Sequence, residues 1–347
     1  MMNTKTIKTV FIYGFTHLLT DAACMAALFS TIYFNALEQN FSFFLIVLYN
    51  VLAFGLQSII GDIFDKNKQP KLCAITGCIL TAIAVLLWQK SLICTVLAGI
   101  GNAFFHLGGG IICLKKGQGK AAIPGMYVAP GAFGLFFGLI SIKNGWFRPE
   151  MFALLHSFAI LFIIFDKLEI EEKQENLKYN NFVLIANFLL LAIVIRSFIG
   201  LSINLDWKDN INLILFLTLA VVGGKFLGGI IADKFGWIRT SVIALLISSP
   251  LIAFGINYPV LYIIGIFFFN FTMPVTLTAL ANMMKDREGF AFGLTTLALV
   301  IGSMPMFAGI KLGNDNAILI FATVVISAVL IYFALKEYMK ISLKFKK

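Results

Sequence analysis

The sequence predicts an all-α polytopic membrane protein with twelve transmembrane helices in two pseudo-symmetric six-helix bundles. Three observations lead to this fold class: the composition, the length of the apolar runs and an internal repeat. Of the 347 residues, 60% are hydrophobic and 13% are charged, whereas a soluble globular domain carries roughly 25% charged residues. Lipid must therefore be the solvent for most of the chain.

The apolar runs are continuous for about 18 to 25 residues, the length that crosses a bilayer as a helix. A membrane β-barrel would instead alternate apolar and polar residues along each strand. We place the predicted helices at residues 9–34, 42–60, 72–89, 92–114, 121–143, 149–166, 181–203, 211–232, 239–256, 259–284, 289–310 and 316–336.

The longest polar connection divides the chain into two halves. It predicts an N-terminal bundle over residues 1–166, a cytoplasmic linker over 167–180, and a C-terminal bundle with a short basic tail over 181–347. Each half then contains six of the predicted helices. The two halves are short for a twelve-helix protein, so we expect short loops.

Lysine and arginine residues set the predicted orientation. With the N-terminus in the cytoplasm, 20 of the 27 basic residues fall in cytoplasmic segments, 5 in external segments, and Arg196 and Lys225 within helices. Such an excess is typical of cytoplasmic loops. We therefore expect a multi-pass inner-membrane (plasma-membrane) protein with both termini cytoplasmic. The same excess explains the net charge of +10 without a nucleic-acid partner.

One motif, G-x-x-x-D-K, occurs at the cytoplasmic ends of the second and eighth predicted helices. The offset between its two aspartates, 233 − 65 = 168, also relates Asn102 to Asn270 and Gly134 to Gly302. We infer that the halves are structural copies related by an axis along the membrane normal, an arrangement known from membrane carriers. The motif residues are Gly61, Asp65 and Lys66 in the first copy and Gly229, Asp233 and Lys234 in the second.

The second copy continues with Gly236 and Arg239, and the whole pattern resembles the loop motif of the major facilitator superfamily. In the first copy Lys68 stands where that motif has glycine. The segment 99–106 is also similar to the G-N-x-x-F-H segment of fosmidomycin-resistance-type exporters, with Leu107 in place of a proline. This resemblance implies a transporter whose two bundles rock about a central site.

The motif also has a physical interpretation of its own. Glycine at a helix end lets a neighbouring helix approach closely. A carboxylate four residues later can accept hydrogen bonds from the N-terminus of a facing helix. We interpret the motif residues, with Gly236 and Arg239, as a cytoplasmic gate; an ordinary cytoplasmic turn is the alternative.

Four ionisable side chains are the clearest cases inside the predicted membrane helices, where charge is costly and points to function. His17 and Asp21 lie on one face of the first helix, His106 on the fourth and Arg196 on the seventh. The resemblance implies that helices one, four, seven and ten line the cavity. We therefore predict a substrate- and proton-binding site formed by His17, Asp21, Asn102, His106, Arg196 and Asn270.

The depth of these residues suggests what they do. At 1.5 Å per residue, Asp21 and Arg196 lie about 19 and 22 Å from the cytoplasmic helix ends, so they are candidates for a pair. Arg196 is suited to bind an anionic group of a small-molecule substrate, and Asp21 and the histidines to pass protons. The alternative is a structural ion pair with two hydrogen-bonded histidines.

No enzyme is predicted, because the sequence has no HExxH, no GxSxG and no P-loop lysine. We expect neither a cofactor nor a metal site, and we interpret the five cysteines as small buried residues. We predict a monomeric, proton-coupled transporter. The Pro-Gly pairs at 124–125 and 130–131 resemble the proline-glycine pattern of superfamily antiporters, and this resemblance implies export. The alternatives are an uncoupled facilitator or uptake carrier, a flippase for lipids or envelope precursors, and a non-transporting membrane receptor.

Overall fold

A computed structural model describes residues 4–167 and 181–344. These residues are almost all helical, and among them only an isolated bridge between Ile203 and Leu312 has β geometry. The helices are α1 (Thr4–Phe34), α2 (Gln39–Asn50), a π-helical turn (Val51–Gly55), α3 (Gln57–Asn67), α4 (Pro70–Leu86), α5 (Ser91–Gly117), α6 (Ala122–Lys143), α7 (Pro149–Phe165), α8 (Phe182–Ser202), α9 (Ile211–Phe235), α10 (Trp237–Ala253), α11 (Pro259–Phe269), α12 (Thr272–Met283), α13 (Glu288–Phe307), a 3₁₀ turn (Asn314–Asn316) and α14 (Ala317–Lys344).

Each of the twelve predicted ranges coincides with one helix or with two consecutive ones. Within the described ranges, nine helices are long and apolar enough to cross a membrane. The helices α4, α7 and α10 are apolar but shorter, at 17 residues each. The chain is a multi-pass membrane protein, and a total of twelve spans stays a prediction.

Two predicted helices are interrupted in the structure. The second range holds the π-helical turn between α2 and α3. The tenth range breaks at Asn270 and Phe271, between α11 and α12. Pro274 explains this second break, because proline has no N–H to donate to the carbonyl oxygen of Asn270.

The described chain forms two compact units. Unit 1 includes Met1–Lys116, Pro130–Glu172 and Arg287–Leu297, and unit 2 includes Gly117–Ala129, Lys173–Asp286 and Ala298–Lys347. The units follow the two halves of the sequence except for two exchanged segments. The start of α6 belongs to unit 2, and the start of α13 belongs to unit 1. Most of the predicted linker, residues 168–180, lies outside the described ranges.

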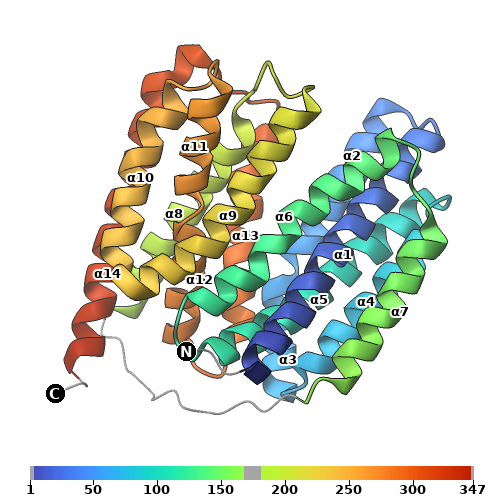
Figure 1. The fold of residues 1–347 in the computed structure, drawn as a ribbon, viewed down its shortest axis with the longest axis horizontal. Helices are drawn as coiled ribbons and strands as arrows, with labels where there is room; N and C mark the ends of the chain where they lie inside the picture. The colour runs from blue at the N-terminus through green and yellow to red at the C-terminus, as the bar shows by residue number, and fades with distance from the viewer. Residues whose placement is uncertain (1–3, 168–180, 345–347) are drawn as a thin grey trace. The chain divides into compact units, whose positions relative to one another are not determined.

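In unit 1, α1 contacts both α4 and α7, and these three helices lie side by side (Figure 1). The face of α1 in this contact is built from small side chains, which let neighbouring helices approach closely. They include Ala22, Ala23, Ala26 and Ala27, packed in one cluster with Phe147 and Phe152. The close packing places the polar residues of α1 inside the unit.

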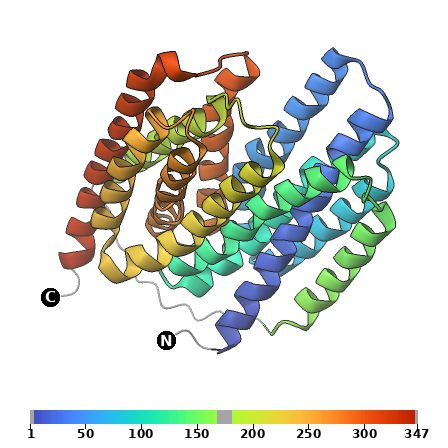
Figure 2. The same cartoon turned by 45° about the horizontal axis from the view of Figure 1, so that its top comes forward.

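In unit 2, α14 contacts both α8 and α10, and α11 contacts α9 and α10 (Figure 2). Glycines on α9 make the contact with the broken helix α11–α12. A Cβ on Gly224 would lie 2.3 Å from the carbonyl oxygen of Phe267, and one on Gly228 would lie 2.4 Å from the Cα of Phe271. Side chains larger than hydrogen are therefore excluded at both positions.

Large apolar side chains cover the outside of both units, as a lipid-facing surface requires. Phe11 and Phe165 in unit 1 are each 72% exposed, and Ile318 in unit 2 is 79% exposed. The described surface thus has the polarity of a membrane protein.

Cysteine labelling tests the predicted orientation. All five native cysteines are buried, so they should contribute little background labelling. Asp209 and Asp286 are both exposed, in the α8–α9 and α12–α13 connections. We expect a membrane-impermeant maleimide added outside cells to label Asp209→Cys and to spare Asp286→Cys, with both reacting after the membrane is opened. The reverse pattern would overturn the orientation.

Candidate functional site

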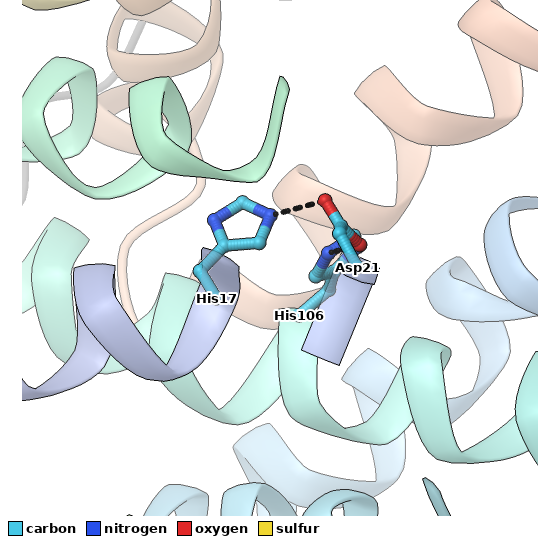
Figure 3. Close-up of side chains that lie close together, drawn as sticks. All are labelled: His17, Asp21 and His106. Carbon is cyan, nitrogen blue, oxygen red and sulfur yellow. Dashed lines mark hydrogen bonds and ion pairs between the residues drawn. The ribbon is translucent and has the colours of Figure 1, made fainter. Parts of the chain in front are cut away.

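Unit 1 holds a hydrogen-bonded cluster around the carboxylate of Asp21 (Figure 3). Asp21 is 4% exposed and lies on α1, one turn after His17. Facing them, α5 contributes Asn102 and His106, which are also four residues apart. Each helix thus presents two polar side chains on one face, as the i, i+4 spacing requires.

Each oxygen of the Asp21 carboxylate has a nitrogen neighbour. Oδ1 accepts a hydrogen bond from Asn102 Nδ2 at 2.8 Å and lies 3.1 Å from His106 Nε2. Oδ2 lies 3.2 Å from His17 Nε2. The two imidazole rings meet edge-on, with centroids 4.3 Å apart. These neighbours supply the hydrogen bonds that a buried carboxylate needs.

A glycine of α6 makes room for this cluster. A Cβ on Gly131 would lie 2.4 Å from His17 Nε2 and 2.5 Å from the Oδ2 of Asp21. The preceding residue, Pro130, stands inside α6 and removes one helical hydrogen bond. The backbone of α6 therefore reaches the cluster directly after a missing helical hydrogen-bond donor.

The same three side chains are close enough for a small cation. One ligand atom each from His17, Asp21 and His106 lies within 4.8 Å of the other two, and imidazole with carboxylate is a ligand set that divalent metals accept. However, each histidine is within hydrogen-bonding distance of a separate carboxylate oxygen, and Asn102 adds a third donor. The carboxylate is satisfied without a metal ion.

The other two predicted site residues lie in unit 2. Arg196 on α8 is 8% exposed, and its Nη2 donates to the carbonyl oxygen of Phe269 at 3.3 Å. Asn270 follows directly, and its Nδ2 donates to the carbonyl oxygen of Ile266 in its own helix at 2.8 Å. Asn270 therefore caps α11, whereas Asn102 binds a carboxylate. The predicted pairing of Asp21 with Arg196 stays a prediction.

Both aspartates of the repeated motif bind the N-terminus of a helix. Asp65 accepts hydrogen bonds from the backbone N–H groups of Gly289 and Phe290, at 2.9 and 2.8 Å. Asp233 accepts them from Ala121 and Ala122, at 3.0 and 2.8 Å. These partners are again 168 residues apart, as are the aspartates themselves. A gating role for the two contacts stays a prediction.

The glycines of the motif stand where the helices touch. A Cβ on Gly61 would lie 2.3 Å from the carbonyl oxygen of Gly289, and one on Gly229 would lie 2.4 Å from that of Ala121. In the turn that follows, Gly236 has a φ of +98°. Lys68 occupies the equivalent position with a φ of +53°, so the first copy holds a lysine in a left-handed conformation that glycine adopts more easily.

The charged motif residues are arranged differently in the two copies. Lys66 Nζ lies 2.5 Å from Asp62, whose other oxygen lies 2.7 Å from Arg287. Lys234 instead lies over the ring of Phe235, at 5.2 Å, and Arg239 is exposed.

Sequence reasoning missed the side chains that support each aspartate. Beside Asp65, Asp62 pairs with Arg287, and Lys115 lies 3.8 Å from Glu288. Beside Asp233, Trp237 Nε1 donates to the carboxylate at 2.9 Å. The Trp237 ring stacks on Tyr338, with centroids 5.7 Å apart. These partners are distant in the sequence or chemically unlike between copies, so the repeat gave no signal for them.

No family model matches the sequence, and no curated protein matches it in sequence. Solved structures do resemble the fold. The E. coli fucose:proton symporter FucP has a TM-score of 0.68 and 12% identity, over 97% of this chain and 99% of that chain. FucP in an outward conformation, a major facilitator superfamily transporter, has a TM-score of 0.59 and 12% identity, over 94% and 99%.

The human organic anion transporter MFSD10 (TETRAN) has a TM-score of 0.66 and 14% identity, over 96% of this chain and 100% of that chain. All of these structures are transporters rather than enzymes. The chain therefore has the fold of major facilitator superfamily transporters, and the resemblance predicted from the sequence is confirmed at the level of fold. The finer similarity to fosmidomycin-resistance-type exporters stays a prediction.

Gly131→Ala tests how closely α6 packs on the cluster. The added methyl group must displace His17 and Asp21, and overpacking of this kind costs about 1–3 kcal/mol. We expect a lower apparent Tm in detergent. Gly55→Ala is the matched helical control, because the nearest atom to its Cβ would lie at 3.8 Å. Equal Tm values for the two variants would show that the cluster tolerates the extra volume.

Proposed function

We propose that this protein is a proton-coupled secondary transporter of a small solute that works by rocker-switch alternating access. In this proposal it acts as a monomer in the inner membrane, with both termini in the cytoplasm, and export is the favoured direction. The observation that carries the proposal is the buried cluster of Asp21 with two histidines, inside a fold shared with secondary transporters.

The cluster has the chemistry of a proton-binding site. A carboxylate and two imidazoles are groups that gain and lose protons, and each imidazole nitrogen lies 3.1–3.2 Å from a carboxylate oxygen. A proton on Asp21 turns one of its acceptor oxygens into a donor, so at least one of these hydrogen bonds must break or reverse. Protonation therefore changes how α1, which carries Asp21, is held to α5.

Another ionisable side chain of α1, Cys24, lies three residues after Asp21 and is buried. The Sγ of Cys24 donates to the carbonyl oxygen of Ala98 at 3.4 Å and lies 3.8 Å from Thr81 Oγ1. No lysine or arginine bonds to the carboxylate in the described part of unit 1, so the histidines are the groups that exchange protons with Asp21.

Helix α6 contributes to both units. In unit 2, the N–H groups of Ala121 and Ala122 at its start donate to Asp233. In unit 1, Gly131 packs against His17 and Asp21. Pro130 stands inside the helix next to this glycine.

Replacing Asp21 with Asn tests the coupling. The amide keeps the shape of the side chain but cannot take up the proton, so we expect exchange of substrate without accumulation against a gradient. A thermal-shift screen of metabolites and drugs at several pH values first supplies a ligand. Vesicles containing the protein then receive that ligand with and without an imposed pH gradient.

Asp209→Asn is the control for Asp21→Asn, because Asp209 is an exposed loop residue. It should accumulate the ligand as the wild type does, and both variants should elute as folded monomers. Accumulation by Asp21→Asn at the wild-type level would remove the coupling role. A wild-type protein that only equilibrates the ligand, whatever the pH gradient, would instead support the uncoupled facilitator.

Replacing Asp233 with Ala tests the gate. Two N–H groups lose a carboxylate partner, and hydrogen bonds to charged groups are each worth about 1.5–3 kcal/mol. We expect the cytoplasmic side to open more often. Ala121→Cys reports this opening, because residue 121 is fully buried and should react faster with a maleimide in the Asp233→Ala background. Asp286→Ala, at an exposed loop position, is the control. An unchanged labelling rate would indicate that Asp233 only caps the start of α6.

A further inference from the structure

We infer that Arg196 and the break between α11 and α12 form a recognition site for an oxyanion, and that the transported solute is an organic anion. This inference rests on the proposed transport function and names its substrate class. Arg196 is a buried cation with an unused hydrogen-bond donor. It is 8% exposed, and its Nε has no hydrogen-bond partner among the described residues.

The bonds that Arg196 does make leave most of its capacity unused. A guanidinium group has five N–H donors. In the described structure Nη2 donates to the carbonyl oxygen of Phe269, and the guanidinium carbon lies 5.2 Å from the centre of the Phe269 ring. The Nε donor of the same group has no partner among the described residues, so part of the guanidinium edge is unused. That edge is the part that binds carboxylate or phosphate oxygens in parallel.

No carboxylate of unit 2 is placed to balance this charge. Every acidic side chain in the described part of the unit lies in a connection or in the last two turns of a helix. They are Asp206, Asp209, Asp233, Asp286, Asp315 and Glu337. Of these, Asp233 is bound to backbone N–H groups and Trp237, and Glu337 to Lys340 and Asn181. A buried arginine with no carboxylate in its own unit is costly in a membrane and favours the binding of an anion.

The break between α11 and α12 lies beside Arg196. Pro274 interrupts the hydrogen-bond ladder, and α12 starts at Thr272, three residues after the carbonyl that Arg196 contacts. The N–H groups of Phe271 and Met273 donate to the carbonyl oxygens of Phe268 and Asn270. The donors available to an oxyanion at this place are therefore those of Arg196.

An aromatic ring lies beside the cation. The guanidinium carbon of Arg196 stands 5.2 Å from the centre of the Phe269 ring. A single cation next to an apolar ring suits a monoanion that carries an apolar body. A polyanion would leave further charges without a partner.

The test uses purified full-length protein in detergent and matched pairs of an acid and its amide. The pairs are benzoate with benzamide and hexanoate with hexanamide, and phenylphosphonate extends the acids to a second oxyanion. We expect at least one acid to raise the apparent Tm of the wild type and its neutral analogue to have no effect. Arg196→Met should abolish that shift. Arg148→Met, at an exposed arginine, should keep it.

A second measurement needs no ligand. If Arg196 is an uncompensated charge, Arg196→Met should have an apparent Tm at or above that of the wild type. If Arg196 mainly holds the carbonyl of Phe269, the variant should be less stable. An acid that stabilises Arg196→Met as much as the wild type, or a wild type stabilised only by neutral compounds, would overturn the inference. So would a less stable variant together with no shift by any acid.

The outcome is separable from that of the transport proposal. Binding of an acid through Arg196 is measured without a gradient, so it does not depend on coupling at Asp21. Asp21→Asn should still be stabilised by the same acid. Loss of accumulation in Asp21→Asn with unchanged acid binding would support both proposals, whereas acid binding without any transport by the wild type would contradict only the transport proposal.

Discussion

A negative charge inside a membrane protein has to be met by donors from the protein itself, because lipid offers none. Asp21 meets this condition through Asn102 and His106 on α5 and His17 on its own helix. The arrangement fixes the rotation of α1 and α5 about their axes, since both polar pairs must face each other. It also restricts position 131 of α6 to glycine, because even a methyl group there would enter the cluster.

The two motif aspartates solve the same problem with backbone donors. Asp65 and Asp233 each take two N–H groups at the start of a helix, where such groups have no partner within the helix. A carboxylate also complements the positive end of the helix dipole. These bonds tie the starts of α13 and α6 to α3 and α9. They account for the exchange of short segments that separates the two compact units from the two halves of the sequence.

The sequence predicts the parts of this structure that depend on spacing. Apolar runs locate the helices, the i, i+4 spacing puts His17 and Asp21 on one face, and the offset of 168 identifies Asp65 and Asp233 as equivalent. It does not predict partners that come from distant segments, such as Arg287 for Asp62 or Tyr338 for Trp237. No periodicity links those residues, because only the fold brings them together. The break at Asn270 was missed because Pro274 stands inside an otherwise continuous apolar run.

The two copies of the repeat agree at the gate and differ in the middle of the helices. The two backbone hydrogen bonds to each motif aspartate recur, and the close glycine contacts recur with them. At mid-helix, unit 1 holds a carboxylate with two imidazoles, whereas unit 2 holds Arg196 and an asparagine that caps its own helix. The contacts of the motif aspartates follow from how helices meet and do not depend on a particular solute. The mid-helix groups have opposite charge, which packing does not require; under the proposed function they serve the proton in unit 1 and the solute in unit 2.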